Sequence, residues 1–400
     1  MFFLYACAAR TAPSVLLDDL SVAFGITSSF LGFIISIAYI PYVAMQIPCG
    51  IIVDKLGARN ITSICCAFCS VGVLLFGMAT SIFQLELGRF LLGLFSASAY
   101  VCCGKVARDL CDKKKYALLM GAATATGCVG GIIGGTPMAY LSSLVGWRNA
   151  TFIIASIGLI IALFAFIFIP KDKEKTEITA KSFDLLFGLM TIIKKPKAWL
   201  LGFCGSVLYL PVSALAELWI IPFLETRFGI STKIASIGSI TIFAGFSIGS
   251  IVSAWVAEKI NSSKKVIVPS SILFIWTLWM ALYSDATNYF WCLFFLLISS
   301  LLSSSNILAY AIVYSMVPEK YSGTSIGFMN AIIMSSGIIF QPLLGKLLDF
   351  FRNGMVNDAG QPVYTIVTYR SAFLFVIFGA ILASIASFFV DDVKFSRKKV

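Results

Sequence analysis

The stretch 50-GIIVDKLGARN-60 places an aspartate and two basic residues between two long apolar runs, residues 27–53 and 60–80. Each run is long enough to cross the roughly 30 Å hydrocarbon core of a bilayer as a helix. Charge is scarce elsewhere: 59% of the 400 residues are hydrophobic, 12% are charged, and the mean hydropathy is +0.94. That composition lies far outside the range of soluble domains. We therefore expect an integral membrane protein in which this stretch is a loop between two spanning helices.

Apolar runs separated by short polar breaks recur along the whole chain. They must be helices, because an open strand cannot satisfy its backbone groups in lipid. Length and hydropathy predict twelve spans: residues 2–22, 27–53, 60–80, 84–104, 116–141, 150–170, 198–221, 234–256, 266–283, 288–315, 323–348 and 371–390. The expected fold class is an all-α integral membrane protein, with twelve transmembrane helices in two pseudo-symmetric six-helix bundles.

The distribution of lysine and arginine sets the expected orientation. With the N-terminus inside, 22 of the 30 basic residues fall on the cytoplasmic side, where such residues are retained. Both termini are then cytoplasmic, and we expect a multi-pass protein of the inner (cytoplasmic) membrane. The net charge of +11 indicates contact with lipid headgroups; no clustered basic and aromatic face suggests a nucleic acid partner. We expect a monomer.

Two residue types argue against metal and enzyme chemistry. Histidine is absent, which removes the commonest zinc ligand and the commonest general base. The eleven cysteines mostly lie within apolar runs, where they are best interpreted as small packing residues. No nucleophile motif is present. We therefore expect no cofactor, no metal site and no enzymatic activity.

The longest polar interruption, residues 171–197, divides the chain into two halves of six spans. The expected domains are an N-terminal bundle (1–170), a cytoplasmic linker with a short interfacial helix (171–197), a C-terminal bundle (198–390) and a cytoplasmic tail (391–400). A weak internal repeat supports this division, because the fifth and eleventh spans are both rich in glycine. Two related halves are typical of transporters that alternate access around a central site.

The loop at 50–60 resembles the signature loop of the major facilitator superfamily of secondary transporters. The residues that match that motif are Gly50, Asp54, Lys55, Gly57 and Arg59, whereas Ala58 stands where a basic residue is usual. Further along, Arg89 and Gly93 resemble the motif of the fourth span, and 146-GWRNATF-152 resembles the turn into the sixth. The resemblance covers essentially all 400 residues and implies the major facilitator fold and secondary transport.

Two further similarities bear on direction and substrate. The glycine run of the fifth span is similar to the motif associated with antiporters, but it lacks the proline expected after the central glycine. The stretches 10-RTAPSV-15 and 209-YLPVSALAELW-219 resemble the phagosomal nutrient transporters of intracellular bacteria. That resemblance implies an amino acid or a nucleoside as the substrate.

Three ionisable side chains are candidates for the membrane interior: Arg10, Arg89 and Glu217. Each costs at least about 2.5–3.5 kcal/mol to bury in lipid and therefore needs a partner or a water-filled cavity. Arginine offers a fork that fits carboxylate, so the two arginines favour an anionic or zwitterionic substrate. Desolvation can bring protonation of Glu217 into competition with substrate binding, which makes it the candidate for proton coupling.

Each of these roles has a structural alternative. Glu217 could form a buried ion pair that holds the seventh span to a neighbour. Arg89 could pair with Glu86, one turn away, and only stabilise the fourth span. For Arg10 a substrate contact and a structural role are equally open.

Further candidates follow from position and from the resemblance. Polar and aromatic side chains of the second, seventh, tenth and eleventh spans could supply substrate contacts: Tyr39, Tyr42, Gln46, Tyr209, Trp219, Asn306, Tyr310, Asn330 and Gln341. At the opening loop, a cluster of charged residues could hold the cytoplasmic side closed in one state: Asp54, Lys55, Arg59 and Arg108. Gly50 would let the second span approach its neighbour, and Gly57 would permit the tight turn. The alternative for these charges is that they only enforce topology.

The leading hypothesis is a proton-coupled symporter that takes up a small zwitterionic or anionic nutrient such as an amino acid. The expected partners are that small-molecule substrate, protons and membrane lipids. A proton-driven antiporter that exports drugs or metabolites is the nearest alternative. A non-transporting membrane sensor is a third, but it would normally need a soluble output domain, and the longest expected cytoplasmic segment is the linker.

Overall fold

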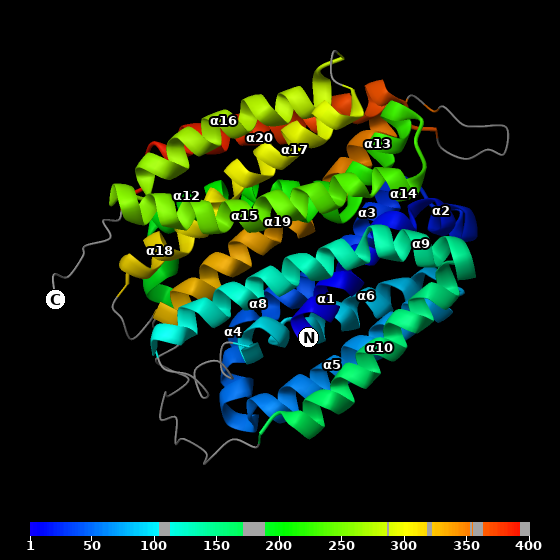
Figure 1. Cartoon of the computed structure of the whole chain (residues 1–400), viewed down its shortest axis with the longest axis horizontal. Coiled ribbons are helices and arrows are strands. Elements are labelled where there is room, and N and C mark those ends of the chain that lie inside the picture. The colour runs from blue at the N-terminus through cyan, green and yellow to red at the C-terminus, as the bar shows by residue number, and fades with distance from the viewer. Residues whose placement is uncertain are drawn as a thin grey trace.

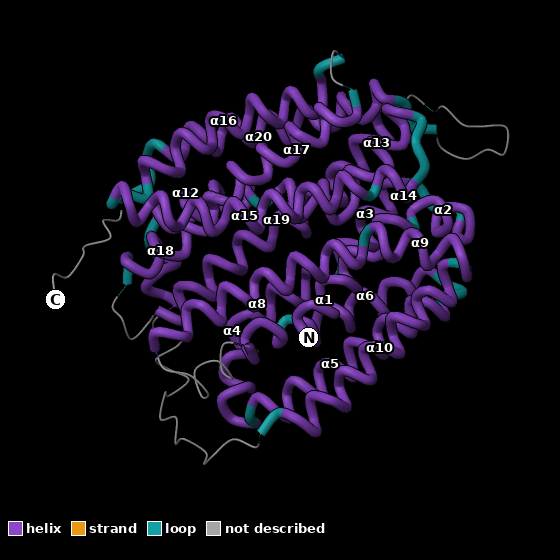
Figure 2. Tube along the Cα trace, in the orientation of Figure 1, coloured by secondary structure: helices purple, strands orange, loops and turns teal. Residues whose placement is uncertain are grey.

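The computed structural model describes residues 1–103, 113–170, 189–285, 288–317, 322–352, 354 and 363–392. Within these ranges nearly every residue is helical and no strand occurs (Figure 2). Ten of the described helical stretches are long and apolar enough to cross a membrane, and a shorter apolar stretch covers Phe30–Gln46. These helices fit the predicted twelve spans, which confirms the fold class. Residues 171–188 of the predicted linker and the tail from 393 onward lie outside the described residues.

The first half contains six spans, the first, second and fifth of which are interrupted. Its helices are α1 (Phe2–Thr11), a 3-10 segment (Ala12–Val15), α2 (Leu17–Phe24), α3 (Ser28–Ser36), α4 (Tyr39–Leu56), α5 (Ala58–Met78), α6 (Ile82–Ser96), α8 (Lys113–Gly134), α9 (Thr136–Val145) and α10 (Trp147–Phe168). In Figure 1 these helices, blue to green, occupy the lower part of the view.

The second half also contains six spans, and those interrupted are the seventh, eighth and tenth of the chain. Its helices are α12 (Pro196–Leu208), a π-helical segment (Pro211–Trp219), α13 (Ile220–Phe228), α14 (Thr232–Ala235), α15 (Ile237–Ile260), α16 (Lys264–Tyr283), α17 (Tyr289–Ser303), a 3-10 segment (Ser304–Ile307), α18 (Leu308–Ser315), α19 (Ser322–Phe351) and α20 (Ile366–Ser387). They occupy the upper part of Figure 1, from green to red.

Backbone conformation shows the repeat between the halves. The helices α2 and α13 both end at a left-handed glycine, Gly25 and Gly229, each with φ +62°. At the same sequence interval, Gly57 (φ +84°) and Asn261 (φ +58°) end α4 and α15. Glycine and asparagine are the residues that adopt positive φ most readily. The stretches 54-DKLG-57 and 258-EKIN-261 thus both end a helix at a residue with positive φ, although ψ differs, 148° at Gly57 and 38° at Asn261.

An arginine at the start of the last span of each half binds the end of the third span of that half. Arg148 Nη1 in α10 donates to the carbonyls of Gly77 and Ala79, at 3.0 and 2.7 Å. Arg370 Nε in α20 donates to the carbonyl of Leu282 at 3.2 Å. Both arginines satisfy carbonyls that a helix end leaves without an intrahelical partner. The contact that Arg148 makes from the turn 146-GWRNATF-152 thus recurs in the second half, where Arg370 makes it from the stretch 369-YRSAF-373.

The two halves meet where α9 and α14 lie, which is the outer end in the predicted orientation. The hydroxyls of Thr136 in α9 and Ser236 at the start of α15 are 2.5 Å apart. Lys233 of α14 lies 4.9 Å from the ring centre of Tyr140. These contacts join elements far apart in sequence, and both cross from one half to the other.

Candidate functional site

The first and seventh spans bring Arg10 and Glu217 together across the two halves. Arg10 lies in the last turn of α1, and its Nε donates to Glu217 Oε1 at 3.0 Å. The Glu217 side chain is almost fully buried, with 1% of its surface exposed, whereas that of Arg10 is 13% exposed. The alternative of a buried ion pair is therefore what this structure contains, and it joins the halves at the interior of the protein.

A proline interrupts each of these spans close to its charged residue. Pro13 opens the 3-10 segment that follows α1, and Pro211 opens the π-helical segment that carries Glu217. Proline has no N–H to donate and its ring displaces the carbonyl of the preceding turn, so the regular α-helical ladder cannot continue. Segments of π-helix are rare and occur frequently at functional sites.

Two tyrosines of α4 surround the ion pair. The Tyr39 hydroxyl donates to the other carboxylate oxygen of Glu217, Oε2. The guanidinium of Arg10 lies over the rings of Tyr39 and Tyr42, with its central carbon 5.4 and 5.8 Å from their centroids. Cation–π contacts of this kind stabilise a cation without occupying its N–H donors.

Arg10 keeps most of its hydrogen-bonding capacity. Beyond the bond to Glu217, the side-chain hydrogen bond that Arg10 makes within the described residues is a weak one, from Nη2 to the Cys7 sulfur at 4.0 Å. A guanidinium carries five N–H donors. The Nη groups of Arg10 can therefore bind a carboxylate from a ligand.

Arg89 of α6 is bound to backbone oxygens. Its Nη2 and Nε donate to the Ile35 carbonyl at 2.9 and 3.3 Å, and its Nη1 reaches the carbonyls of Ala9 and Arg10 at 3.4 Å. Only 2% of its surface is exposed. Within the described part of the chain no ion pair joins it to Glu86. Arg89 thus ties the fourth span to the first and second beside Arg10.

A chain of amide and hydroxyl groups continues from this site between the halves. Tyr310 donates to Asn330 Oδ1 at 2.8 Å, and Asn330 Nδ2 donates to Gln46 Oε1 at 2.8 Å. Gln46 Nε2 then lies 3.4 Å from the carbonyl of Tyr42. The structure therefore joins four of the residues predicted from sequence into one network.

A second cluster of polar side chains lies between the π-helical segment and α19. Trp219 Nε1 donates to the backbone carbonyl of Gln341 at 3.2 Å, and Gln341 Nε2 donates to the Ser213 carbonyl at 2.7 Å. The hydroxyls of Ser213 and Ser336 are 2.8 Å apart. Ser213 and Ser336 were not among the candidates from sequence, and their residue types carried no signal that would have distinguished them from other serines in the spans.

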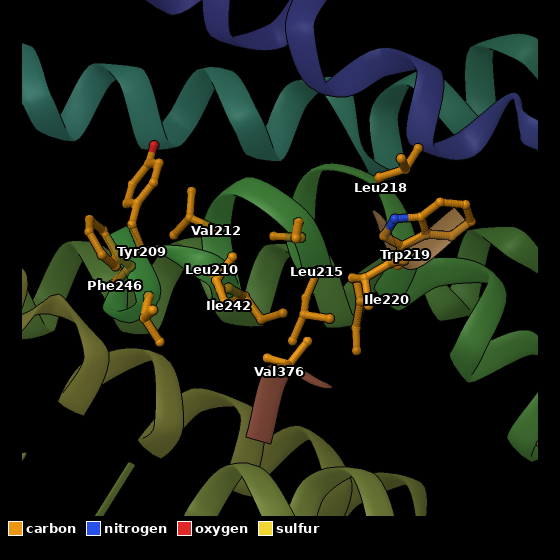
Figure 3. Packing of buried hydrophobic residues seen from close by; sticks show 14 of the residues in the cluster. Tyr209, Leu210, Val212, Leu215, Leu218, Trp219, Ile220, Ile242, Phe246 and Val376 are labelled. Carbon is orange, nitrogen blue, oxygen red and sulfur yellow. The ribbon is translucent and has the colours of Figure 1, made fainter. Parts of the chain in front are cut away.

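The apolar residues around Glu217 hold the π-helical segment in place. Figure 3 shows Tyr209 and Leu218 pointing toward the blue-to-teal ribbons of the first half, while Leu215 points toward Val376 of α20. Tyr209 packs edge-on against Phe246, with ring centroids 5.6 Å apart. Tyr209 is therefore placed against the other half, although no hydrogen bond ties it to the Arg10 network in the described residues.

Asn306 is separate from these groups. It lies in the 3-10 segment Ser304–Ile307 and is 4% exposed. Its Oδ1 has no hydrogen-bond donor within the described ranges. Its predicted place at the substrate site stays a prediction.

The gate candidates are described only in part. Gly50, Asp54 and Lys55 lie in α4, but their side-chain environment is outside the described residues, as is all of Arg108. Arg59 begins α5 and donates from Nε to the Phe166 carbonyl at 2.7 Å, with its guanidinium carbon 4.4 Å from the Phe166 ring centre. In this structure Arg59 therefore binds the last turns of α10 in its own half.

No group of three or more cysteine or acidic side chains that could hold a metal occurs among the described residues. The site consists instead of one carboxylate, two guanidinium groups, and phenol, amide and hydroxyl groups between two bundles. Such an arrangement can bind and release a small polar molecule. It offers no activated nucleophile.

Comparison with known proteins identifies the family. The model of the Major Facilitator Superfamily matches residues 1–342. The chain belongs to this family. The fold agrees, because a bacterial homologue of the human lysosomal transporter Spinster, solved in an inward-facing and occupied conformation, superposes with a TM-score of 0.80. That match covers 97% of this chain and 94% of the other at 16% identity, and it shows the fold alone.

Curated relatives differ in how much of their own length this chain matches. The probable L-galactonate transporter of Escherichia coli (strain K12) is 25% identical over 43% of this chain and 38% of its own length. The sialic acid transporter NanX of the same strain is 23% identical over 82% of this chain and 79% of its own length. The chain thus matches little more than a third of the first of these relatives and about four fifths of the second.

Proposed function

We propose that this major facilitator protein is a secondary active transporter that takes up a small nutrient bearing a carboxylate, together with a proton. One observation carries the proposal. Arg10, at the contact between the halves, has free N–H donors and partial exposure, while its counter-ion Glu217 belongs to the opposite half. A ligand bound at Arg10 would therefore lie at the contact between the two halves, which move relative to each other in alternating access.

The charges of the site favour an anion. Arg10 and Arg89 contribute two positive charges and Glu217 one negative charge, so the three groups carry one positive charge in excess. Arg89 is held by carbonyl dipoles, which leaves Arg10 as the group that can bind the ligand. A planar guanidinium with two parallel donors matches a carboxylate in geometry as well as in charge.

Competition for Arg10 supplies a route to proton coupling. If a substrate carboxylate displaces Glu217, the glutamate is left buried without its cation, which is unfavourable by several kcal/mol. Uptake of a proton by Glu217 removes that cost. For a monoanionic substrate the complex then gains one negative and one positive charge, and the transport step is electroneutral. Tyr39, which donates to Glu217, would stabilise the carboxylate before the proton arrives.

The named relatives support an organic acid as the substrate. The substrates in their names, L-galactonate and sialic acid, are both acids. An amino acid remains within the same proposal, because its carboxylate would bind Arg10 as that of any other organic acid would.

The experiment is uptake into proteoliposomes of a panel of sugar acids, other organic acids, amino acids and nucleosides, with and without an inward proton gradient. We expect a carboxylate-bearing member to accumulate only with the gradient, and Glu217→Gln to exchange substrate without accumulating it. Glu86→Gln is the matched control, because Glu86 also lies in a span but outside the site. Gradient-driven accumulation by Glu217→Gln at the wild-type level would remove Glu217 from the coupling step.

We also propose that the loop at 50–60 is a latch on the cytoplasmic side. Because Arg59 binds α10 in this structure, the latch would depend on contacts that Asp54 and Lys55 make with Arg108 or with the second half. Asp54→Asn should then change the rate of transport and leave substrate affinity unchanged. If neither rate nor affinity changes, these charges serve topology alone.

A further inference from the structure

Gln341 carries a buried oxygen that no group in the described ranges satisfies. Its side chain is fully buried in α19, and its Nε2 donates to the Ser213 carbonyl at 2.7 Å. A carbonyl only accepts hydrogen bonds, so this contact fixes which amide atom is nitrogen and which is oxygen. The remaining atom, Oε1, has no donor there.

An unpaired acceptor of this kind requires an explanation. Leaving a buried oxygen without a donor is unfavourable, because its bond to water is lost and not replaced, and about nine in ten buried polar groups are paired. A water molecule or a ligand would supply the donor that the described residues lack.

The place of Gln341 in the fold favours a ligand. Gly337, one turn earlier in α19, lies against the Tyr39 ring so closely that a Cβ there would be 2.6 Å from the ring atoms. Tyr39 in turn donates to Glu217. On the other side of the amide, Ser213 lies in the same π-helical segment as Glu217. The Gln341 side chain thus binds the segment that carries Glu217, and it lies one turn along α19 from the contact with Tyr39.

We infer that Gln341 Oε1 is a second recognition point for the transported molecule, and that this molecule carries a hydrogen-bond donor, a hydroxyl or an ammonium group, in addition to its carboxylate. The inference rests on the proposed function, because Arg10 supplies the partner of the carboxylate. Arg10 belongs to the first half and Gln341 to the second. A molecule with both groups therefore binds the two halves at once, whereas a simple carboxylate binds only one of them.

The test is the affinity of purified full-length protein for matched carboxylates, measured by isothermal titration calorimetry. One series is hexanoate, 2-hydroxyhexanoate and norleucine, and a smaller one is propanoate, lactate and alanine. Within a series the members differ by one donor group beside the carboxylate. We expect a donor-bearing member to bind at least about tenfold more tightly than its unsubstituted parent, because one hydrogen bond and one unsatisfied oxygen are at stake. The hydroxyl and ammonium members show which donor the site accepts.

The variants test the role of Gln341 separately from that of Arg10. Gln341→Met, of similar volume but without an acceptor, should bring donor-bearing and parent ligands to within about twofold of each other, while Arg10→Met should weaken all carboxylates. Gln84→Met, at the start of α6 and outside the site, is the control and should keep the preference.

Three results would overturn the inference. Equal affinities across a series in the wild type would mean that Oε1 binds water. This measurement needs no variant, so it tests the inference even if Gln341→Met does not fold. A uniform loss for all ligands in Gln341→Met would assign Gln341 to packing. Binding of no carboxylate at all would refute the proposed function, and this inference with it.

Discussion

The guanidinium of Arg89 lies between the carbonyls of Ile35, Ala9 and Arg10, which belong to the second and first spans. This arrangement satisfies a buried cation with backbone dipoles, and the fork geometry of arginine allows it to reach both spans at once. A lysine has the same charge but a single nitrogen. The two residues are therefore not equivalent at this position.

We predict that Arg89→Lys lowers the free energy of unfolding by about 1–3 kcal/mol, because carbonyls that Arg89 now binds would be left unsatisfied. Carboxylate affinity per folded molecule should remain within about threefold of the wild type. Thermal unfolding and titration calorimetry measure the two quantities. Arg10→Lys is the matched comparison, and for it the larger effect should fall on affinity. The prediction fails if Arg89→Lys loses affinity without losing stability.

The sequence predicted which charged residues are interior, but not which partner each of them binds. The rarity of charge in the spans indicated Arg10, Arg89 and Glu217 as interior residues, and all three are mostly buried. Nothing in the sequence showed that Arg10 binds Glu217 while Arg89 binds carbonyls. Pairing depends on how two spans separated by two hundred residues come together, and that is a property of packing. For the same reason the free oxygen of Gln341 became evident only in three dimensions.

At the scale of helices, close contacts between spans depend on single glycines. A Cβ built on Gly93 of α6 would lie 1.9 Å from the carbonyl oxygen of Ala38, an atom that cannot rotate away. By contrast, a Cβ on Gly379 of α20 would meet Val207 at 3.9 Å, an ordinary van der Waals distance. These two glycines allow a matched comparison.

Gly93→Ala should force α6 away from the second span and destabilise the protein by about 1–3 kcal/mol or more, as overpacking does. Gly379→Ala should be neutral or stabilising, because alanine is favoured over glycine inside a helix. Thermal unfolding in one detergent compares them directly. Equal melting temperatures for the two variants would contradict the close contact at Gly93.

Helix positions were more predictable than helix shape. Apolar length located the spans, yet the first and seventh were expected to be continuous and are instead interrupted just before Pro13 and Pro211, where α1 ends at Thr11 and α12 at Leu208. Proline indicated where a break could occur. It did not indicate that the break in the seventh span would become a π-helical segment, because that depends on how the neighbouring spans hold the widened turn.

At the scale of the whole molecule, the contact between Thr136 and Ser236 reports which end is closed. These hydroxyls, 2.5 Å apart, join α9 of one half to the start of α15 of the other. In an alternating-access cycle such a contact must open and close.

We predict that the double variant Thr136→Cys, Ser236→Cys forms a disulfide under mild oxidation and that uptake then stops until the disulfide is reduced. The hydroxyl distance is compatible with the short Cβ separation that a disulfide requires. The two single variants control for the native cysteines. Full cross-linking with undiminished uptake would show that this contact stays closed throughout the cycle.

The division into halves was predictable from the polar stretch 171–197 and from glycine content, but the precision of the repeat was not. Gly25 and Gly229 match in both φ and ψ, whereas Gly57 and Asn261 share only a positive φ, and the residues around all four have diverged. Sequence comparison within one chain does not detect such a match, because what is preserved is backbone conformation.

The ion pair at the centre of the molecule also constrains how the chain is made. Its partners are 207 residues apart, so the ribosome delivers Arg10 to the bilayer long before Glu217 has been synthesised. Until the seventh span is inserted, Arg10 lacks its carboxylate in surroundings where a lone charge costs at least about 2.5–3.5 kcal/mol. Before that point the cation of Arg10 has only the rings of Tyr39 and Tyr42 in its own half to stabilise it. Insertion of the seventh span therefore stabilises the first bundle as well as the second.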